Sequence, residues 1–241
     1  MQKSAVIPTT MCYALPETEL VDLLAHQLTS LFLFDRKTHG RTLADAVHQA
    51  LIRTTYCFCH INDKYYTRDG EVWFDPYHSG QYTIFLYYVS HSLWKDFQNP
   101  RVASMVFMLN KTLGAVDLFY DVVLPDIFYL DHVMGTTMGR ATYGNYFIFS
   151  QNCTVGNNRG FYPVFGDHVT LHARAMVVGQ CRIGSHVVIA ADAYVKDQDI
   201  PDNTLVFGTT PNLTLVQKDE PYMRENHGHK WRTNPQPPPL P

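Results

Sequence analysis

The chain has 241 residues, of which 46% are hydrophobic and 17% charged, and its formal net charge is −3. This composition supplies a hydrophobic core, so we expect one folded domain or two small ones rather than a disordered chain. The near-neutral charge argues against a nucleic-acid partner. Met1–Pro16 lacks the apolar run of a secretory signal, and no later apolar stretch is long enough to span a bilayer. We therefore expect a cytoplasmic protein.

The five cysteines show no spacing typical of a metal site. Cys57 and Cys59 stand two apart, but no second cysteine or histidine pair follows at a distance that zinc ligands would need. We expect reduced, mostly buried thiols and no bound metal.

The N-terminal region has the texture of helices. After Pro16, leucines at 20, 24 and 28 recur at helical spacing, and we expect the helix to break at Gly40 and a second one to run to about Phe58. Residues 65–74 read as strand, turn and strand, with the turn at 68–70. Two more helices are expected at 81–95 and 100–113.

A six-residue repeat governs the C-terminal half. Large apolar residues recur every sixth position, at Phe165, Leu171, Val177, Ile183, Ile189 and Val195. Small or apolar residues stand four positions after the first five, at Val169, Ala175, Cys181, Val187 and Ala193. Tyr143, Phe149 and Val155 keep the same step upstream. A helix does not bring every sixth residue to one face. Three short parallel strands per turn do, and they form a triangular prism.

The sequence therefore predicts an α+β fold in three parts. A mostly helical domain with a short hairpin covers 1–115, and a parallel β-helix covers 116–213. An extension follows at 214–241, and we expect it to be mobile or extended, above all in the polar tail from Tyr222 to Pro241.

Several segments resemble a known family of hexapeptide-repeat enzymes. They are Val116–Leu118, Leu130–Gly135, Met138–Ala141, Gln151–Gly156 and Gly208–Pro211. Over about Asp75 to Leu213 the chain resembles serine acetyltransferases and, in particular, the serine acetyltransferase-like enzymes of bacterial capsule and O-antigen gene clusters. The resemblance implies a left-handed β-helix, acetyl-CoA as co-substrate, direct acetyl transfer, and a homotrimer or a pair of trimers with active sites between neighbouring copies.

The resemblance also implies a catalytic pair. His132 matches the family's general base, and Asp117 matches the carboxylate that orients it. A coil takes about three hexapeptides, so residues fifteen apart should stand on adjacent coils. A carboxylate on one imidazole nitrogen leaves the other free to accept a proton, and the ordinary pKa of histidine suits this near neutrality.

For the acceptor, Asp75 and Asp131 match family positions that contact it, although Asp75 also suits a turn or helix cap. Arg140 is a candidate contact to an anionic sugar. The serine-specific enzymes carry an Arg-His pair where this chain has Phe161 and Tyr162. Phenylalanine does not bind a carboxylate, whereas aromatic rings pack well on a sugar.

The sequence therefore predicts acetyl-CoA-dependent O-acetylation of a saccharide. Serine O-acetylation and N-acetylation of an amino sugar are the alternatives. The residues expected to lie along the coenzyme are Asn157, Ala173, Ala191, Gly208 and Pro211, and Lys196 and Lys218 are candidates for its 3′-phosphate.

Two more distant hypotheses remain open at this point. His132, His168 and His172 suggest a γ-class carbonic anhydrase, a β-helix with three zinc-binding histidines. The residues at 157–163 interrupt the six-residue register between the first two, which argues against it. The second hypothesis is a β-helix scaffold without enzymatic activity that binds a sugar nucleotide or a partner protein.

Overall fold

The computed structural model describes residues 11–233, 235, 237, 239 and 240. The chain forms two compact units. The first contains the residues up to Leu113 together with those from Lys230 onward, and the second runs from Gly114 to His229. None of the described helices is long and apolar enough to cross a membrane.

The first unit combines helices with a small sheet. Its elements are β1 (Met11–Tyr13), α1 (Glu17–Leu31), α2 (Arg36–Cys59), a 3-10 helix η1 (Lys64–Tyr66), β2 (Thr67–Arg68), β3 (Glu71–Phe74), α3 (Ser79–Lys95) and α4 (Pro100–Gly114). β2 and β3 form the predicted hairpin, and β1 pairs parallel to β3 on its other side. α2 packs against α3, and the buried Phe58 ring contacts Tyr66 with centroids 4.6 Å apart. The predicted helices are thus confirmed, whereas β1 was not anticipated.

Gly40 does not break a helix, and that prediction is wrong. It lies inside α2, and the break falls at residues 32–35. There the Asp35 carboxylate accepts a hydrogen bond from the Lys37 amide at 3.0 Å and caps the first turn of α2. A capped start and a long buried face outweigh the helix-weakening effect of one glycine.

The end of the described chain returns to the first unit. Trp231 is buried and forms a β-bridge with Ile61. Lys230 Nζ lies 2.8 Å from a carboxylate oxygen of Asp63, and Arg232 Nε donates to the Ile61 carbonyl at 2.6 Å. The residues between 214 and 229 belong to the second unit. They complete strand β15 and form a helix, α5 (Glu220–His227), neither of which the sequence analysis anticipated.

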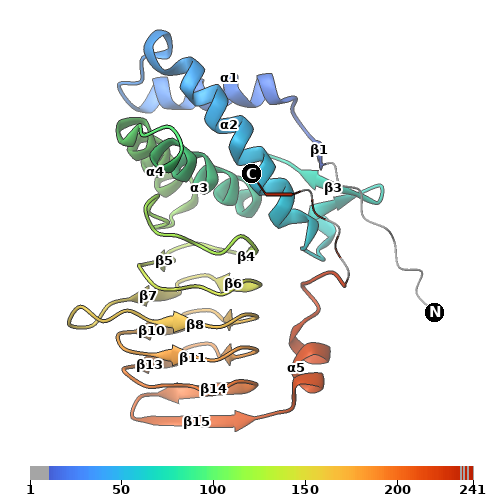
Figure 1. Cartoon of the computed structure of the whole chain (residues 1–241), viewed down its shortest axis with the longest axis vertical. Coiled ribbons are helices and arrows are strands. Elements are labelled where there is room, and N and C mark those ends of the chain that lie inside the picture. Colours follow the sequence, from blue (N-terminus) through green and yellow to red (C-terminus); the bar gives the residue numbers. More distant parts are fainter. Residues whose placement is uncertain (1–10, 234, 236, 238, 241) are drawn as a thin grey trace. The chain divides into compact units, whose positions relative to one another are not determined.

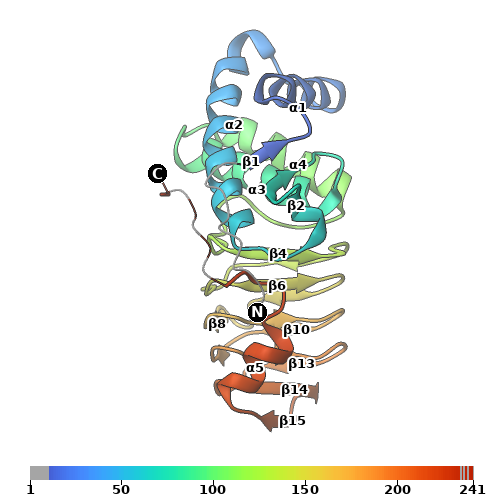
Figure 2. The ribbon, with the colours of Figure 1, turned by 90° about the vertical axis from the view of Figure 1, so that its right-hand side faces the viewer.

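The second unit is a three-sided parallel β-helix, and its coils are stacked in Figures 1 and 2. Side 1 contains β4 (Phe128–Asp131), β6 (Phe147–Ser150), β9 (Thr170–Leu171), β12 (Val188–Ile189) and the start of β14 (Thr204–Thr209). Side 2 contains β5 (Thr137–Met138), β7 (Thr154–Gly156), β10 (Met176–Val178) and β13 (Tyr194–Lys196). Side 3 contains β8 (Val164–Phe165) and β11 (Arg182–Ile183). β15 (Asn212–Gln217) pairs antiparallel to β14 and closes the end.

The six-residue repeat fills the inside of this prism, as predicted. None of its six principal residues from Phe165 to Val195 exposes more than 3% of its surface, and the five companions from Val169 to Ala193 expose at most 1%. Phe149, Val155, Phe147 and Cys153 continue this core upstream and are fully buried. Burial of one large side chain per strand is therefore what fixes the coil register.

Each corner of the prism is turned by a residue with positive φ. We name the three corners by the sides they join, and two of them are regular ladders. Edge 1–2 carries Ala115, Gly135, Asn152, Arg174 and Asp192, and edge 3–1 carries Tyr146, His168, His186 and Asn203. Edge 2–3 includes Gly179 and Asp197. Helix α5 lies alongside the stack in both views, with Met223 buried.

Candidate active site

His132 lies on edge 1–2, in a turn that is longer than its neighbours. Leu130 pairs with Phe149 on side 1, and Thr137 pairs with Thr154 on side 2. The chain therefore takes seven residue steps from Leu130 to Thr137, but five from Phe149 to Thr154. It also takes five steps at the next two coils, from 171 to 176 and from 189 to 194. The two extra residues form a bulge, and His132 at its start has a φ of 50°.

The bulge presents the imidazole of His132 to the outside. Its side chain is 88% exposed, and its Nε2 lies 3.9 Å from a carboxylate oxygen of Asp131, which is itself 39% exposed. Among the described residues, Asp131 is the only acid within 4.0 Å of this imidazole. An accessible imidazole beside a carboxylate can accept a proton from a bound acceptor.

Asp117 stands on the neighbouring rung, without a described contact to His132. It forms a bridge to Thr137, and its backbone receives a hydrogen bond from Met138 N at 3.0 Å. The Gly135 amide donates to the Ala115 carbonyl at 2.8 Å, so the segments 115–117 and 135–137 are adjacent. The predicted proximity of Asp117 and His132 themselves stays a prediction. The orienting role of Asp117 stays a prediction, and Asp131 is a second acid that can fill it.

Three of the residues expected along the coenzyme lie on the same edge as His132. Ala173 and Ala191 occupy successive coils, since the Asp192 amide donates to the Ala173 carbonyl at 3.1 Å. Gly208, with a φ of 84°, turns the next coil between Val206, which pairs with Ile189, and Thr209, which pairs with Tyr194. Successive coils stack about 4.8 Å apart. Edge 1–2 therefore offers a line of small residues that runs from the imidazole toward the C-terminal end, where Pro211 follows in the turn to β15.

A second group of predicted contacts lies on edge 2–3. The chain takes nine steps from Val155 to Val164 there, but five from Val177 to Arg182. The added residues form the predicted interruption, which includes Asn157 and the exposed rings of Phe161 and Tyr162. Lys196 is exposed at the end of β13, on the same edge. The predicted coenzyme and ring contacts are thus divided between two edges of the prism.

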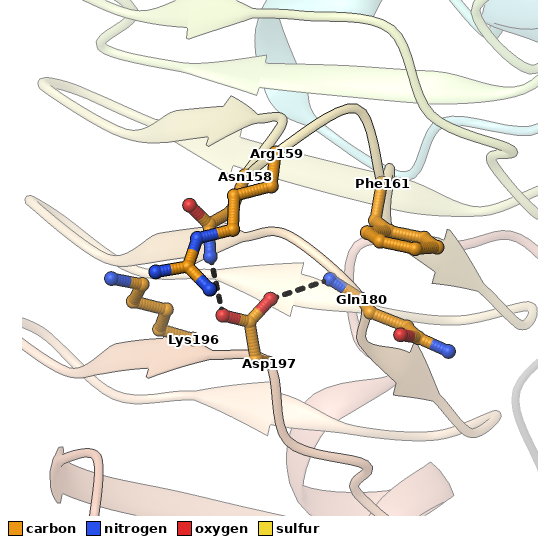
Figure 3. Close-up of a pocket in the computed structure, with 6 residues that line it drawn as sticks. All are labelled: Asn158, Arg159, Phe161, Gln180, Lys196 and Asp197. Atoms are coloured by element: carbon orange, nitrogen blue, oxygen red, sulfur yellow. Dashed lines mark hydrogen bonds between the residues drawn. The ribbon is translucent and has the colours of Figure 1, made fainter.

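A pocket lies beneath the hairpin of this interruption, and sequence analysis missed most of its residues. The cavity has a volume of about 310 Å³. Its walls are Asn158, Arg159, Phe161, Gln180, Lys196 and Asp197. Figure 3 shows the charged groups of Arg159 and Lys196 on one side and the Phe161 ring on the other. Only Phe161 and Lys196 had been predicted, because the Asn158–Gly160 segment reads as an ordinary turn.

Arg140, also in the chain between sides 2 and 3, is already paired. Its guanidinium donates to the Asp121 carboxylate at 2.6 Å. This ion pair gives Arg140 a role within the coil, so contact with a substrate would have to compete with Asp121.

Asp75 belongs to the first unit and shapes the start of α3. Its carboxylate accepts a hydrogen bond from the Tyr77 amide at 2.8 Å, and its own amide donates to Gln81 Oε1 at 2.7 Å. This is the turn role that an Asp-Pro pair suits, and contact with an acceptor stays a prediction. Lys218, the second candidate for the 3′-phosphate, places its ammonium 4.8 Å from the centre of the Tyr222 ring.

The three histidines that suggested a carbonic anhydrase do not converge. His132 lies on edge 1–2 and His168 lies on edge 3–1, stacked between the rings of Tyr146 and His186. No group of three potential metal ligands occurs among the described residues. Burial and the neighbouring His186 lower the pKa of His168 to about 4. Burial likewise lowers the pKa of His172, against the influence of Asp131.

No family model matches the chain. A serine acetyltransferase of Staphylococcus epidermidis is 26% identical over 136 residues. The match covers 54% of this chain and 63% of that relative, less than two thirds of its length.

Solved structures share the fold. The structure of Neisseria gonorrhoeae serine acetyltransferase in complex with serine has a TM-score of 0.61 at 24% identity, covering 82% of this chain and 83% of that one. A serine acetyltransferase in complex with CoA also has a TM-score of 0.61, at 18% identity, covering 83% and 84%. With its hexapeptide β-helix and helical N-terminal region, the chain is similar in sequence and in fold to serine acetyltransferases.

Proposed function

We propose that this protein is an O-acetyltransferase that uses acetyl-CoA. The observation that carries the proposal is the exposed imidazole of His132 at the head of the line Ala173, Ala191 and Gly208 on edge 1–2. The solved relative with bound CoA and the curated relatives named serine acetyltransferase support the same chemistry.

The proposed step is direct transfer without a covalent enzyme intermediate. His132 removes the proton from the acceptor hydroxyl as its oxygen attacks the thioester carbonyl carbon. The tetrahedral intermediate then expels the CoA thiolate, which takes up a proton, and the acetyl ester remains on the acceptor. Backbone N–H groups beside the bulge stabilise the oxyanion. Asp117 or Asp131 holds the imidazole in the tautomer that leaves one nitrogen free.

Serine or a similar small hydroxyl amino acid is the acceptor that the relatives favour. Both the curated relatives and the solved structure with bound serine carry that name. A saccharide acceptor is the second candidate, because Phe161 and Tyr162 expose 53% and 43% of their surfaces. Exposed rings of this kind form a floor on which the C–H face of a sugar packs.

We further propose that the complete site lies between copies in a homotrimer. His132 and the coenzyme line occupy edge 1–2, whereas Asn157, Phe161 and Lys196 occupy edge 2–3 of the same prism. Side 2 separates these edges within one chain. A neighbouring copy that offers its edge 2–3 to edge 1–2 unites both sets.

The function is tested by following thiol release from acetyl-CoA with a panel of acceptors. The panel contains serine, threonine, an amino sugar and neutral and anionic saccharides. We expect acceptor-dependent thiol release and an acetyl ester on serine, identified by mass spectrometry. Light scattering on the same sample gives the mass, for which we expect three chains. If no acceptor gives thiol release and calorimetry detects no binding of CoA, the proposed acetyltransferase activity is rejected.

A further inference from the structure

Side 1 of the prism is covered from outside, whereas sides 2 and 3 are open. Three residues form a column on the outer surface of side 1, because the residue that follows each of them belongs to the core. They are Ile148, Thr170 and Val188, and none exposes more than 8% of its surface. Met176 on side 2 and Val164 on side 3 hold the same place before a core residue, and they expose 37% and 45%. An element outside the coils therefore covers side 1.

Helix α5 provides this cover. It lies alongside the stacked coils in both views, and Met223 near its centre exposes 2% of its surface. Its last turn lies close to side 1, since His172, which directly follows β9, influences the pKa of His227. The helix thus shields the outer column by packing on it.

The helix is held on side 1 without hydrogen bonds to the coils. In the described part of the chain, every hydrogen bond of Glu220–Gly228 stays within the segment that begins at Asp219. An isolated helix as short as α5, which has eight residues, is unstable in water. Its helical form therefore depends on contact with side 1, and loss of this contact would also unwind it.

The last turn of α5 buries a ring nitrogen that has no partner. Nε2 of His227 is buried and has no hydrogen-bond partner among the described residues. A neutral imidazole keeps one nitrogen without a proton, so it can direct that nitrogen to such a place. The imidazolium carries a proton on both nitrogens, and a buried, charged N–H without an acceptor costs free energy. Protonation of His227 therefore disfavours the docked helix.

The groups around His227 strengthen this effect. Burial is the largest cause that lowers its pKa, followed by His172 on the coil and His229 just beyond the helix. Burial also lowers the pKa of His172, against the influence of Asp131. Protonation of both His172 and His227 would place like charges on the two sides of the contact.

The other end of α5 responds only at lower pH. His168 there is influenced by Glu220 and Arg224 of the helix and by Asp167 and His186 of the coils. Its pKa of about 4 keeps this imidazole neutral during mild acidification. The effect of pH between 7.5 and 5.5 is therefore concentrated at the last turn of the helix.

We propose that α5 is a cover of side 1 that mild acidification releases. As His172 and His227 take up protons, the helix leaves the coils and unwinds, which exposes the apolar outer column. β15 before it and the buried Trp231 after it stay in place, so the segment between them opens as a loop. The inference is independent of the proposed acetyltransferase activity.

The direction of the effect follows from proton linkage. Both imidazoles have a lower pKa in the docked state than in the released state, where the ordinary value is about 6.5. The released state therefore binds more protons below this pH. Docking is most stable above about pH 6.5 and weakens as the pH falls.

Hydrogen exchange followed by mass spectrometry tests the release. Protection factors, corrected for the intrinsic pH dependence of exchange, are compared at pH 7.5 and 5.5 for a peptide covering α5 and one covering β10 and β11. We expect protection of α5 to fall about 3- to 10-fold, less than two fully buried groups would give, because both imidazole rings are partly exposed. Protection of β10 and β11 should not change.

Variants identify the groups that take up the protons. The double variant His172→Gln/His227→Gln cannot be protonated at these positions and should keep its α5 protection at pH 5.5. His26→Gln, at an exposed position on α1, is the matched control and should follow wild type. Met223→Gln should lose α5 protection at both pH values, which establishes that the peptide reports docking.

Three results would overturn the inference. The first is equal α5 protection at both pH values in wild type. The second is a parallel loss in β10 and β11, which indicates global unfolding. The third is a double variant that loses protection as wild type does. If the double variant is unprotected already at pH 7.5, His172→Gln and His227→Gln are compared singly, and falls as large as that of wild type in both overturn the inference.

Discussion

Two corners of the same prism differ in turn length. Edge 3–1 has the same turn length at every coil, whereas edge 1–2 varies and carries the proposed catalytic histidine. On edge 3–1 the chain takes six steps at each coil, from 142 to 148, from 164 to 170 and from 182 to 188. On edge 1–2 it takes seven, then five at three coils, and finally three from Val206 to Thr209. Both corners use positive-φ residues, so the backbone device is the same.

The constant corner is filled by rings, and the variable corner displays a reactive group. Tyr146, His168 and His186 stack in parallel, with centroids 4.3 and 4.6 Å apart and planes within 6°. On edge 1–2 the two extra residues displace His132 from the regular row of corner residues, and its side chain is exposed. Constant spacing lets neighbouring side chains support one another, whereas added residues release a side chain for function.

The largest expected effect tests the chemical side of this comparison. His132→Ala should lower the rate by about 10²- to 10⁴-fold, because the variant lacks the imidazole that takes the acceptor proton in the proposed step. Acetyl transfer to serine at saturating substrates measures it. His186→Ala on the structural corner serves as the control and should retain the rate. A His132→Ala enzyme with nearly full turnover would remove the base assignment.

A second comparison uses one glycine at each corner. A Cβ on Gly144, at edge 3–1, would lie 2.3 Å from the carbonyl oxygen of Gly166 in the next coil. Because backbone gives way poorly, Gly144→Ala should destabilise the fold by about 3 kcal/mol. A Cβ on Gly135, at edge 1–2, would lie 2.3 Å from Asn152 Oδ1, a side-chain atom that can move.

Gly135→Ala should therefore cost less, about 1–2 kcal/mol, mainly for its positive φ. Urea denaturation of both variants measures the free energies of unfolding. Equal losses for the two variants would contradict the difference between the corners.

The column of stacked rings, formed by Tyr146, His168 and His186, also predicts how the free energy of unfolding depends on pH. The pKa of His168 is about 4 in the fold, because burial and then His186 disfavour its charge, and about 6.5 in an unfolded chain. Between these values the unfolded state binds more protons, so stability rises with pH. The contribution of neutral His168 to the free energy of unfolding is complete above about pH 6.5 and is lost as the pH falls toward 4.

Thermal melts from pH 7.5 to 4.5 check this dependence. His168→Phe keeps a ring in the column but cannot be protonated, so its melting temperature should fall less steeply over this range. His26→Phe, at an exposed position on α1, is the control and should follow wild type. Parallel curves for His168→Phe and wild type would show that His168 in the ring column does not cause the pH dependence of the melting temperature.

The smallest effect concerns the stacking itself. His186→Ala removes one ring from the column and should cost about 1 kcal/mol, which lowers the melting temperature by about 2–4 °C in a domain of this size. Arg174→Ala, which breaks an exposed ion pair with Asp192 on edge 1–2, should change it less. A larger loss for Arg174→Ala would reverse the assignment of edge 3–1 as the stabilising corner.

The sequence predicts the inside of the prism better than its corners. Every sixth residue from Phe165 to Val195 must be large and apolar to fill a coil, so the period alone identifies the core. Corner turns face solvent, and their lengths follow no composition rule. The bulge at His132 and the hairpin at Arg159 therefore emerge only when both flanking strands are paired.

The candidate site shows the same limit of prediction from the sequence. His132 was found through a resemblance in its segment, because a histidine in an exposed turn carries no signal of its own. Arg159 and Asp197 were missed because each lies in a stretch that reads as a turn, and what unites them is a contact between separate coils. The segment after 213 was missed for a related reason, since β15 and α5 are stabilised by partners distant in sequence.

The reversal of direction between β14 and β15 has a consequence for how these molecules coexist at high concentration. A parallel solenoid ends in an open row of amide and carbonyl groups, onto which the first coil of another molecule could be added without limit. Here the last row is occupied over six paired positions by a strand that runs the opposite way. The coil of another molecule would have to pair with this antiparallel strand instead of continuing the parallel stack, so we expect the chain's final turn to disfavour growth into fibres.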